Sequence, residues 1–140
     1  MITLHVDCNK FSKSSLDGIT SEIYFEINNQ IFPEKDWNDF VIVILNFWLS
    51  EVSKIGFDGL GNFVFMDGPI NFSILKTGTK AIFKGYIQNR KIIDEEINFD
   101  EFLQTLISSA IKTYEEMKKK KWENKDINTL KKNIELILNE

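Results

Sequence analysis

Four segments rich in strand-forming residues follow one another closely in the middle of the chain. They cover residues 62–66, 70–76, 80–88 and 91–97. The turns between them contain Asp-Gly-Pro, Thr-Gly and Asn-Arg, and none is long enough for the crossover that two parallel strands require. The sequence therefore predicts an antiparallel meander, and the other elements must pack against it.

Two further strands are predicted before the meander. Apolar and polar residues alternate over residues 2–6 and again over residues 22–27, as in strands with one buried face. Asn28 and Asn29 tolerate positive φ and can close a tight hairpin onto residues 30–32. The first part of the chain is thus expected to contribute to the sheet.

A long helix is predicted between these strands and the meander. Asp36 is the predicted N-cap, and apolar residues recur every three or four positions from Trp37 to Ile55, which gives a helix of about 19 residues. Its apolar arc is wider than a surface helix needs, so other elements should cover it on two sides. We expect this helix at the centre of the fold, with Trp37 and Trp48 at least half buried.

Two helices are predicted after the meander. The first begins at Asn98 or Asp100 and ends with the lysine run 118–121, and the second is capped by Asp126. Together the elements predict an α+β fold, with an antiparallel sheet of about six strands packed against one central helix and two C-terminal helices. Residues 1–140 are expected to form a single domain.

The chain has one cysteine, Cys8, and one histidine, His5. A disulfide framework, a thiolate zinc site and a histidine-cluster metal site are therefore excluded. A thiol and an imidazole can also form a nucleophile and base, but residues three apart in a strand lie on opposite faces. We expect no catalytic residues, no metal and no cofactor.

The predicted location is the cytoplasm. The first residues lack a basic segment followed by an apolar one, so no signal peptide is expected. The apolar run of the central helix is interrupted by Asn46 and is too short to span a bilayer. No membrane partner is expected, and the sequence does not indicate an oligomeric state.

Acidic residues predominate in the first 111 positions, which carry 15 acidic against 9 basic residues. The densest acidic group lies within residues 94–101, and only Arg90 and Lys91 flank it in sequence. Protection of an edge strand and stabilisation of a helix N-terminus would explain this group without a ligand, and a site for a basic partner is the other interpretation. The predicted partner-binding residues form one exposed ridge: Asp94, Glu95, Glu96, Asp100 and Glu101.

The lysine run 118–121 closes a predicted helix. Cations stabilise helix C-termini, and Glu115 and Glu116 stand four positions before Lys119 and Lys120. No stripe of basic residues interleaved with aromatic ones accompanies the run, so no nucleic-acid partner is expected.

Two segments are more distinctive. The first is F-P-x-x-x-W-x-D-F at residues 32–40, and the second is F-x-F-M-D-G-P at residues 63–69. With these segments and Trp48 between them, roughly residues 22–75 resemble a group of small, mostly uncharacterised bacterial proteins similar to immunity proteins. The resemblance implies a single-domain cytoplasmic protein that neutralises a secreted toxin, and it brings no catalytic residues.

Two functions from different classes follow. The first is a non-enzymatic protein-binding domain, an immunity-type inhibitor that blocks a basic cognate toxin through its acidic surface. The alternative is a small-ligand or metal-dependent enzyme with a carboxylate-lined pocket, formed by Asp39, Asp67 and the acids of residues 94–101. The first is the function we predict.

Overall fold

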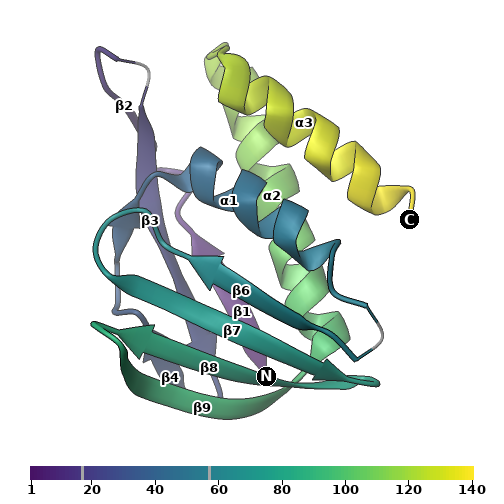
Figure 1. Ribbon diagram of the computed structural model, residues 1–140. Helices are drawn as coiled ribbons and strands as arrows, with labels where there is room; N and C mark the ends of the chain where they lie inside the picture. The colour runs from purple at the N-terminus through teal and green to yellow at the C-terminus, as the bar shows by residue number, and fades with distance from the viewer. Residues whose placement is uncertain (17, 57) are drawn as a thin grey trace.

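The computed structural model describes residues 1–16, 18–56 and 58–140. Within these ranges it confirms the α+β class, with two antiparallel sheets and three helices (Figure 1). The elements are β1 (Ile2–Val6), β2 (Ser12–Lys13), β3 (Ile19–Ile27), β4 (Gln30–Phe32), β5 (Asn38–Asp39), α1 (Val41–Val52), β6 (Leu60–Val64), β7 (Ile70–Thr77), β8 (Lys80–Ile87), β9 (Arg90–Asn98), α2 (Phe99–Lys120) and α3 (Lys125–Leu138).

The first sheet is built around β3. This strand pairs antiparallel with β1 and with the short strands β2, β4 and β5. Asn28 and Asn29 have φ values of 49° and 71° and close the β3–β4 hairpin as predicted. The alternation of β3 places Ile23, Phe25 and Ile27 in the core and the intervening residues on the outer face.

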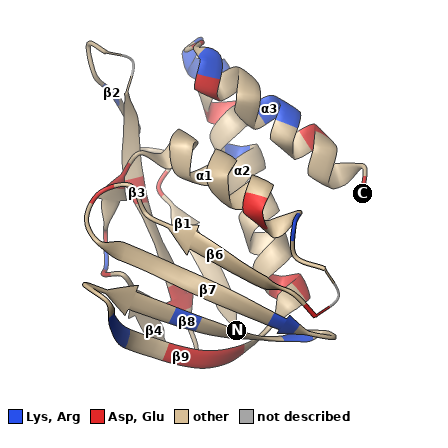
Figure 2. Cartoon of the chain, in the orientation of Figure 1, with Lys and Arg blue, Asp and Glu red and all other residues tan. Residues whose placement is uncertain are grey.

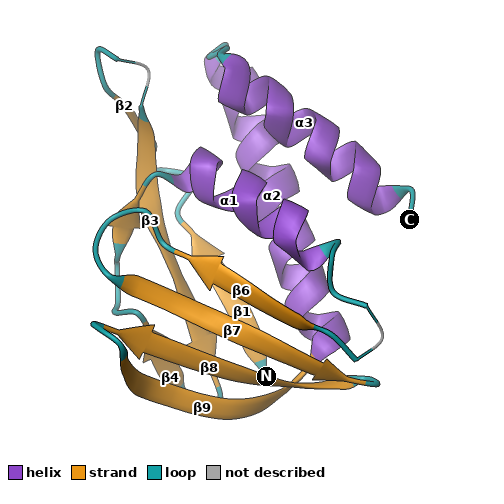
Figure 3. Ribbon diagram, in the orientation of Figure 1, coloured by secondary structure: helices purple, strands orange, loops and turns teal. Residues whose placement is uncertain are grey.

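The predicted meander is confirmed and forms the second sheet, in the order β6-β7-β8-β9. The six long strands thus belong to two sheets, where the sequence suggested one. Figure 3 shows the three helices gathered on one side of the strands.

Aromatic rings fill the space between the two sheets. The ring of Phe25 in β3 lies 5.1 Å from Phe72 and 5.3 Å from Phe83, which belong to the second sheet. Trp48 of α1 stacks on Phe25 at 5.5 Å and meets the edge of Phe72 at 5.1 Å. The helix therefore inserts its largest side chain where the sheets meet.

The predicted start and end of the central helix are wrong. Asn38 and Asp39 pair with Glu22 and Ser21 of β3, so the chain is still extended where the pattern predicted helix. The predicted N-cap, Asp36, has a φ of 61° and lies outside the helix. As a result α1 has 12 residues, from Val41 to Val52. Trp37 lies before the helix, but its side chain is more than half buried, as predicted, and Trp48 is fully buried.

α1 is covered on two sides, as expected. One side faces the sheets through Trp48. On the other, Asn46 Nδ2 donates to the carbonyl of Asp126 in α3 at 2.9 Å, and Asn133 Nδ2 donates to Asn46 Oδ1 at 3.0 Å. These bonds fix α3 across α1.

The two C-terminal helices begin with asparagine caps. Asn98 Oδ1 accepts a hydrogen bond from the backbone N–H of Glu101. Of the two predicted starts of α2, Asn98 and Asp100, the structure therefore has the first. Asn124 caps α3 through the N–H of Ile127, so the predicted cap at Asp126 is wrong by two residues.

α1 occupies the open edge of the second sheet. Glu51 Oε2 accepts a hydrogen bond from the backbone N–H of Asn62 at 2.9 Å, and the Trp48 indole donates to the Val64 carbonyl at 2.9 Å. Both backbone groups belong to β6, which has a strand neighbour on one side only.

Side chains of α2 bond β1, an edge strand of the first sheet, in the same way. Thr105 Oγ1 accepts from the backbone N–H of Leu4 at 2.9 Å, and Ser109 Oγ donates to the Leu4 carbonyl at 3.3 Å. Helix side chains thus satisfy backbone groups of both edge strands.

Replacing Trp48 by alanine should lower the free energy of unfolding by about 3–5 kcal/mol, because it removes the ring between the sheets and a buried hydrogen bond. Trp48→Phe keeps a ring and should cost less. Urea unfolding of both variants tests this. A midpoint of Trp48→Ala within error of the parent would contradict the packing described above.

Candidate functional site

Four of the five predicted partner-binding acids are exposed. They occupy the outer face of β9 and the first turn of α2: Asp94, Glu96, Asp100 and Glu101. Glu95 is different, because it is only partly exposed and its carboxylate accepts a hydrogen bond from Gln30 Nε2 of β4. The structure therefore leaves four of these residues exposed and turns Glu95 towards the first sheet.

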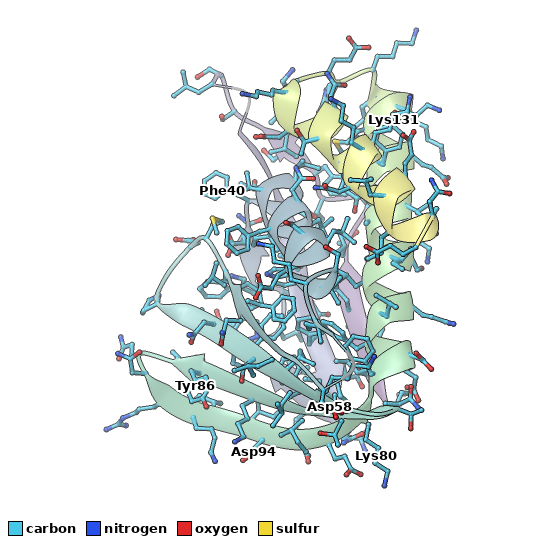
Figure 4. All side chains as sticks on the ribbon, turned by 45° about the vertical axis from the view of Figure 1, so that its right-hand side comes forward. Phe40, Asp58, Lys80, Tyr86, Asp94 and Lys131 are labelled. Atoms are coloured by element: carbon cyan, nitrogen blue, oxygen red, sulfur yellow. The ribbon has the colours of Figure 1, made fainter. Side chains whose placement is uncertain are left out.

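In the folded chain, lysine side chains lie among these acids. Lys91 Nζ lies 2.8 Å from Asp94 Oδ2, and this hydrogen bond lowers the pKa of the Asp94 carboxyl. Lys84 of β8 is paired directly with Asp94, and Lys80 is paired with Asn98. Lys80 and Asp94 both point outward from the sheet in Figure 4. The acids of β9 are therefore partly neutralised within the chain, by Lys91, which flanks them in sequence, and by Lys84, which does not.

Asp39 connects the two distinctive segments of the sequence. It is 1% exposed, and its carboxylate accepts four hydrogen bonds. The donors are the Trp37 indole at 3.0 Å and the backbone N–H groups of Phe40, Met66 and Asp67 at 2.7, 3.2 and 3.1 Å. The tryptophan segment and the hairpin are thus bonded to one carboxylate.

This arrangement bears on the enzymatic alternative. The Asp39 carboxylate is buried and its oxygens already accept hydrogen bonds. The side chain of Asp67 is exposed, and this residue contacts the Asp39 carboxylate through its backbone N–H. In residues 1–16, 18–56 and 58–140, no group of three or more His, Cys, Asp or Glu side chains is placed to hold a metal ion. The observations give Asp39 a structural role.

A second group of acids lies on the outer face of the first sheet. The alternation of β3 that buries Phe25 places Glu22, Tyr24 and Glu26 on the opposite face, and His5 of β1 is paired with Tyr24. We call this surface the acidic face. Its members are Asp7, Glu22, Glu26 and Asp36, together with His5 and Tyr24.

The centre of the acidic face is an aromatic pair. The rings of His5 and Tyr24 stack with centroids 5.0 Å apart and an angle of 21° between their planes. His5 Nε2 lies 3.2 Å from Glu26 Oε1. The His5 imidazole therefore contacts the Tyr24 ring through its face and the Glu26 carboxylate through its edge.

One lysine stands among these acids. Lys10 Nζ lies 2.9 Å from Glu22 Oε2 and 4.0 Å from Asp7 Oδ2, and the bond to Glu22 raises the pKa of the lysine. Glu22 is 9% exposed and is the most enclosed member of the acidic face, whereas the side chain of Lys10 is exposed.

The acidic face is concave. A cavity of about 220 Å³ is lined by His5, Val6, Asp7, Glu22, Tyr24 and Asp36. Partial burial raises the pKa of Tyr24, and the negative charges of Asp36, Glu22 and other acids raise it further. An ammonium or guanidinium group would meet carboxylates and the face of an aromatic ring here, both of which attract cations.

The sequence contained part of this site. The run Glu-Ile-Tyr-Phe-Glu-Ile at residues 22–27 already placed two acids and a tyrosine on one face of a strand. His5 and Asp36 could not be added, because their positions depend on the pairing of β1 with β3 and on the turn after β4.

Comparison of the chain with protein-family models, with curated proteins and with solved structures finds no match. Among the described residues, no helix combines the length and the apolar character needed to cross a membrane.

Asp39→Ala should lower the free energy of unfolding by about 3–5 kcal/mol, because it leaves several buried N–H groups without an acceptor. Asp67→Ala removes an exposed carboxylate from the same hairpin and should cost less than about 1 kcal/mol. Urea melts of the two variants provide the comparison. Equal losses would show that the Asp39 bonds do not stabilise the fold.

Asp36→Asn should lower the pKa of Tyr24, because a phenolate forms more readily when a neighbouring negative charge is removed. The pKa should stay above the ordinary tyrosine value, since the burial remains. NMR titration of the tyrosine ring carbons measures it, with Glu101→Gln on α2 as the control. If both substitutions have the same effect, Asp36 does not act locally on Tyr24.

Proposed function

We propose that this protein is a non-enzymatic protein-binding domain, an immunity-type inhibitor that neutralises a basic bacterial toxin by holding a cationic side chain of it on the acidic face. The observation that carries the proposal is the cavity in which carboxylates surround the stacked His5–Tyr24 pair. This chemistry fits an arginine of the partner, whose planar guanidinium can stack on a ring and bond a carboxylate at two points.

The acidic face suits this role better than the acids of β9 and α2. On β9, Lys84 and Lys91 lie beside Asp94, so a basic partner would meet positive charge as well. On the acidic face, Lys10 is paired with Glu22, while Asp36 is exposed at the rim of the cavity. The docking surface is therefore proposed for the first sheet.

Exposed apolar side chains support a protein partner. Phe40, the N-cap residue of α1, and Val43 and Phe47 within the helix are 43%, 38% and 48% exposed, and their spacing places them on one side of the helix. Figure 4 shows Phe40 at the surface. Aromatic residues of this kind commonly supply much of the affinity of a protein interface, whereas charges mainly increase the association rate.

The test compares two double variants with the same change in net charge. Glu26→Gln with Asp36→Asn removes two negative charges from the acidic face, and Glu96→Gln with Glu101→Gln removes two from the predicted ridge. Figure 2 shows that acidic residues occur in both sheets, so the comparison separates local from general charge effects. The partner to test is any basic toxin domain that a neighbouring gene encodes, and the measurement is its association rate at low and high salt.

The acidic-face variant should associate about three- to tenfold more slowly at low salt, and the difference should shrink at high salt, because screening weakens steering. The ridge variant should stay within about twofold of the parent. A larger effect of the ridge variant would place docking on β9 and α2. Absence of any complex with the neighbouring gene product would overturn the immunity function.

A further inference from the structure

The function proposed above leaves the C-terminal lysines unused, although they line a cavity. This cavity has a volume of about 350 Å³ and lies between the end of α2 and the first turn of α3. Its lining residues are Tyr114, Lys118, Lys121, Trp122, Glu123, Ile127 and Asn128.

The local fold that makes this cavity is set by one residue. Lys121 adopts a φ of 58°, and the next backbone N–H, that of Trp122, bonds back to the Met117 carbonyl at 3.1 Å. This left-handed turn ends α2 and returns the indole towards the last turn of the helix. Asn124 then caps α3, whose first turn forms the opposite wall.

Ammonium groups gather around the two aromatic rings of this cavity. Lys118 Nζ lies 5.8 Å from the centre of the Tyr114 ring, and Lys120 Nζ lies 5.3 Å from the Trp122 ring. Lys13, from the β2 hairpin, reaches within 5.9 Å of the same indole. In the sequence Tyr114 and Trp122 flank the lysine run without being interleaved with it, but the fold brings lysine side chains over both rings.

Two lysines that line the cavity, Lys118 and Lys121, remain available for a ligand. Lys120 is 4.0 Å from Glu116, whereas neither Lys118 nor Lys121 has a carboxylate within 4.0 Å among the described residues. Among the described residues that line the cavity, Glu123 is the only acidic one. The first turn of α3 adds the positive end of a helix dipole.

We propose that this cavity binds a nucleotide, with the phosphates on Lys118 and Lys121 and the base against Tyr114 and Trp122. An ammonium gains more from a phosphate than from an exposed ring, so Lys118 would turn from the Tyr114 ring to the phosphate and leave that ring face for the base. Stacking on aromatic rings combined with lysine contacts is how proteins hold single-stranded nucleic acids. The ligand is either a free nucleotide or a nucleotide of a single strand.

The experiment uses the full chain and four probes: adenosine diphosphate, inorganic pyrophosphate, adenosine and a short oligothymidylate. Calorimetry and tryptophan fluorescence measure binding to the parent and to Lys118→Gln with Lys121→Gln. The matched control is Lys131→Gln with Lys132→Gln on α3, which removes the same charge from residues that are not among those lining the cavity. Figure 4 labels Lys131. Thermal melts establish that both variants are folded.

Adenosine diphosphate should bind saturably, and more tightly than either pyrophosphate or adenosine. The cavity variant should lose about tenfold in affinity and the control less than about twofold. Tighter binding of the oligothymidylate would identify a single strand as the ligand, and tighter binding of the diphosphate would identify a free nucleotide.

Three results would overturn the proposal. They are the absence of saturable binding by any probe, equal losses in the cavity variant and the control, and equal affinities for pyrophosphate and adenosine diphosphate. The last of these would mean that the rings make no contact with a base. None of the three bears on the acidic face, so the function proposed above is tested separately.

Discussion

The carboxylate of Asp39 accepts bonds from an indole and three backbone N–H groups, and these bonds join segments that are far apart in the sequence. They hold the start of α1 against the hairpin between β6 and β7. With that end fixed, Trp48 enters the space between the sheets and contacts Phe25 and Phe72. A charge-assisted network at the boundary of the core therefore positions the aromatic packing inside it.

The helices gather on one side of the strands, and the outer faces of both sheets carry charged side chains. The two faces differ in character. On the second sheet, Lys84 and Asp94 are directly opposite each other, as is typical of a solvated surface. On the first, acids collect around an aromatic pair and a cavity. The location of a candidate site thus follows from which charges the strand register brings together.

Local patterns in the sequence predicted most of the fold. Alternation and short turns were sufficient for the six long strands, because both depend on neighbouring residues. The start of α1 was missed because Asn38 and Asp39 pair with a strand that lies far earlier in the chain. The candidate site was missed for the same reason, since His5 meets Tyr24 only through strand register. Glu95 was assigned to the exposed ridge because Gln30, its partner, is distant in sequence.

The helix side chains that bond the edges of β1 and β6 also affect how the chain behaves before it is fully folded. An edge strand with unsatisfied backbone groups is a template for pairing with another chain. Glu51 and Trp48 occupy such groups on β6, and Thr105 and Ser109 occupy them on β1. A partly folded chain in which the strands had formed but α1 and α2 had not docked would leave these groups of both edges open to pairing with another chain, so docking of the two helices also protects against aggregation.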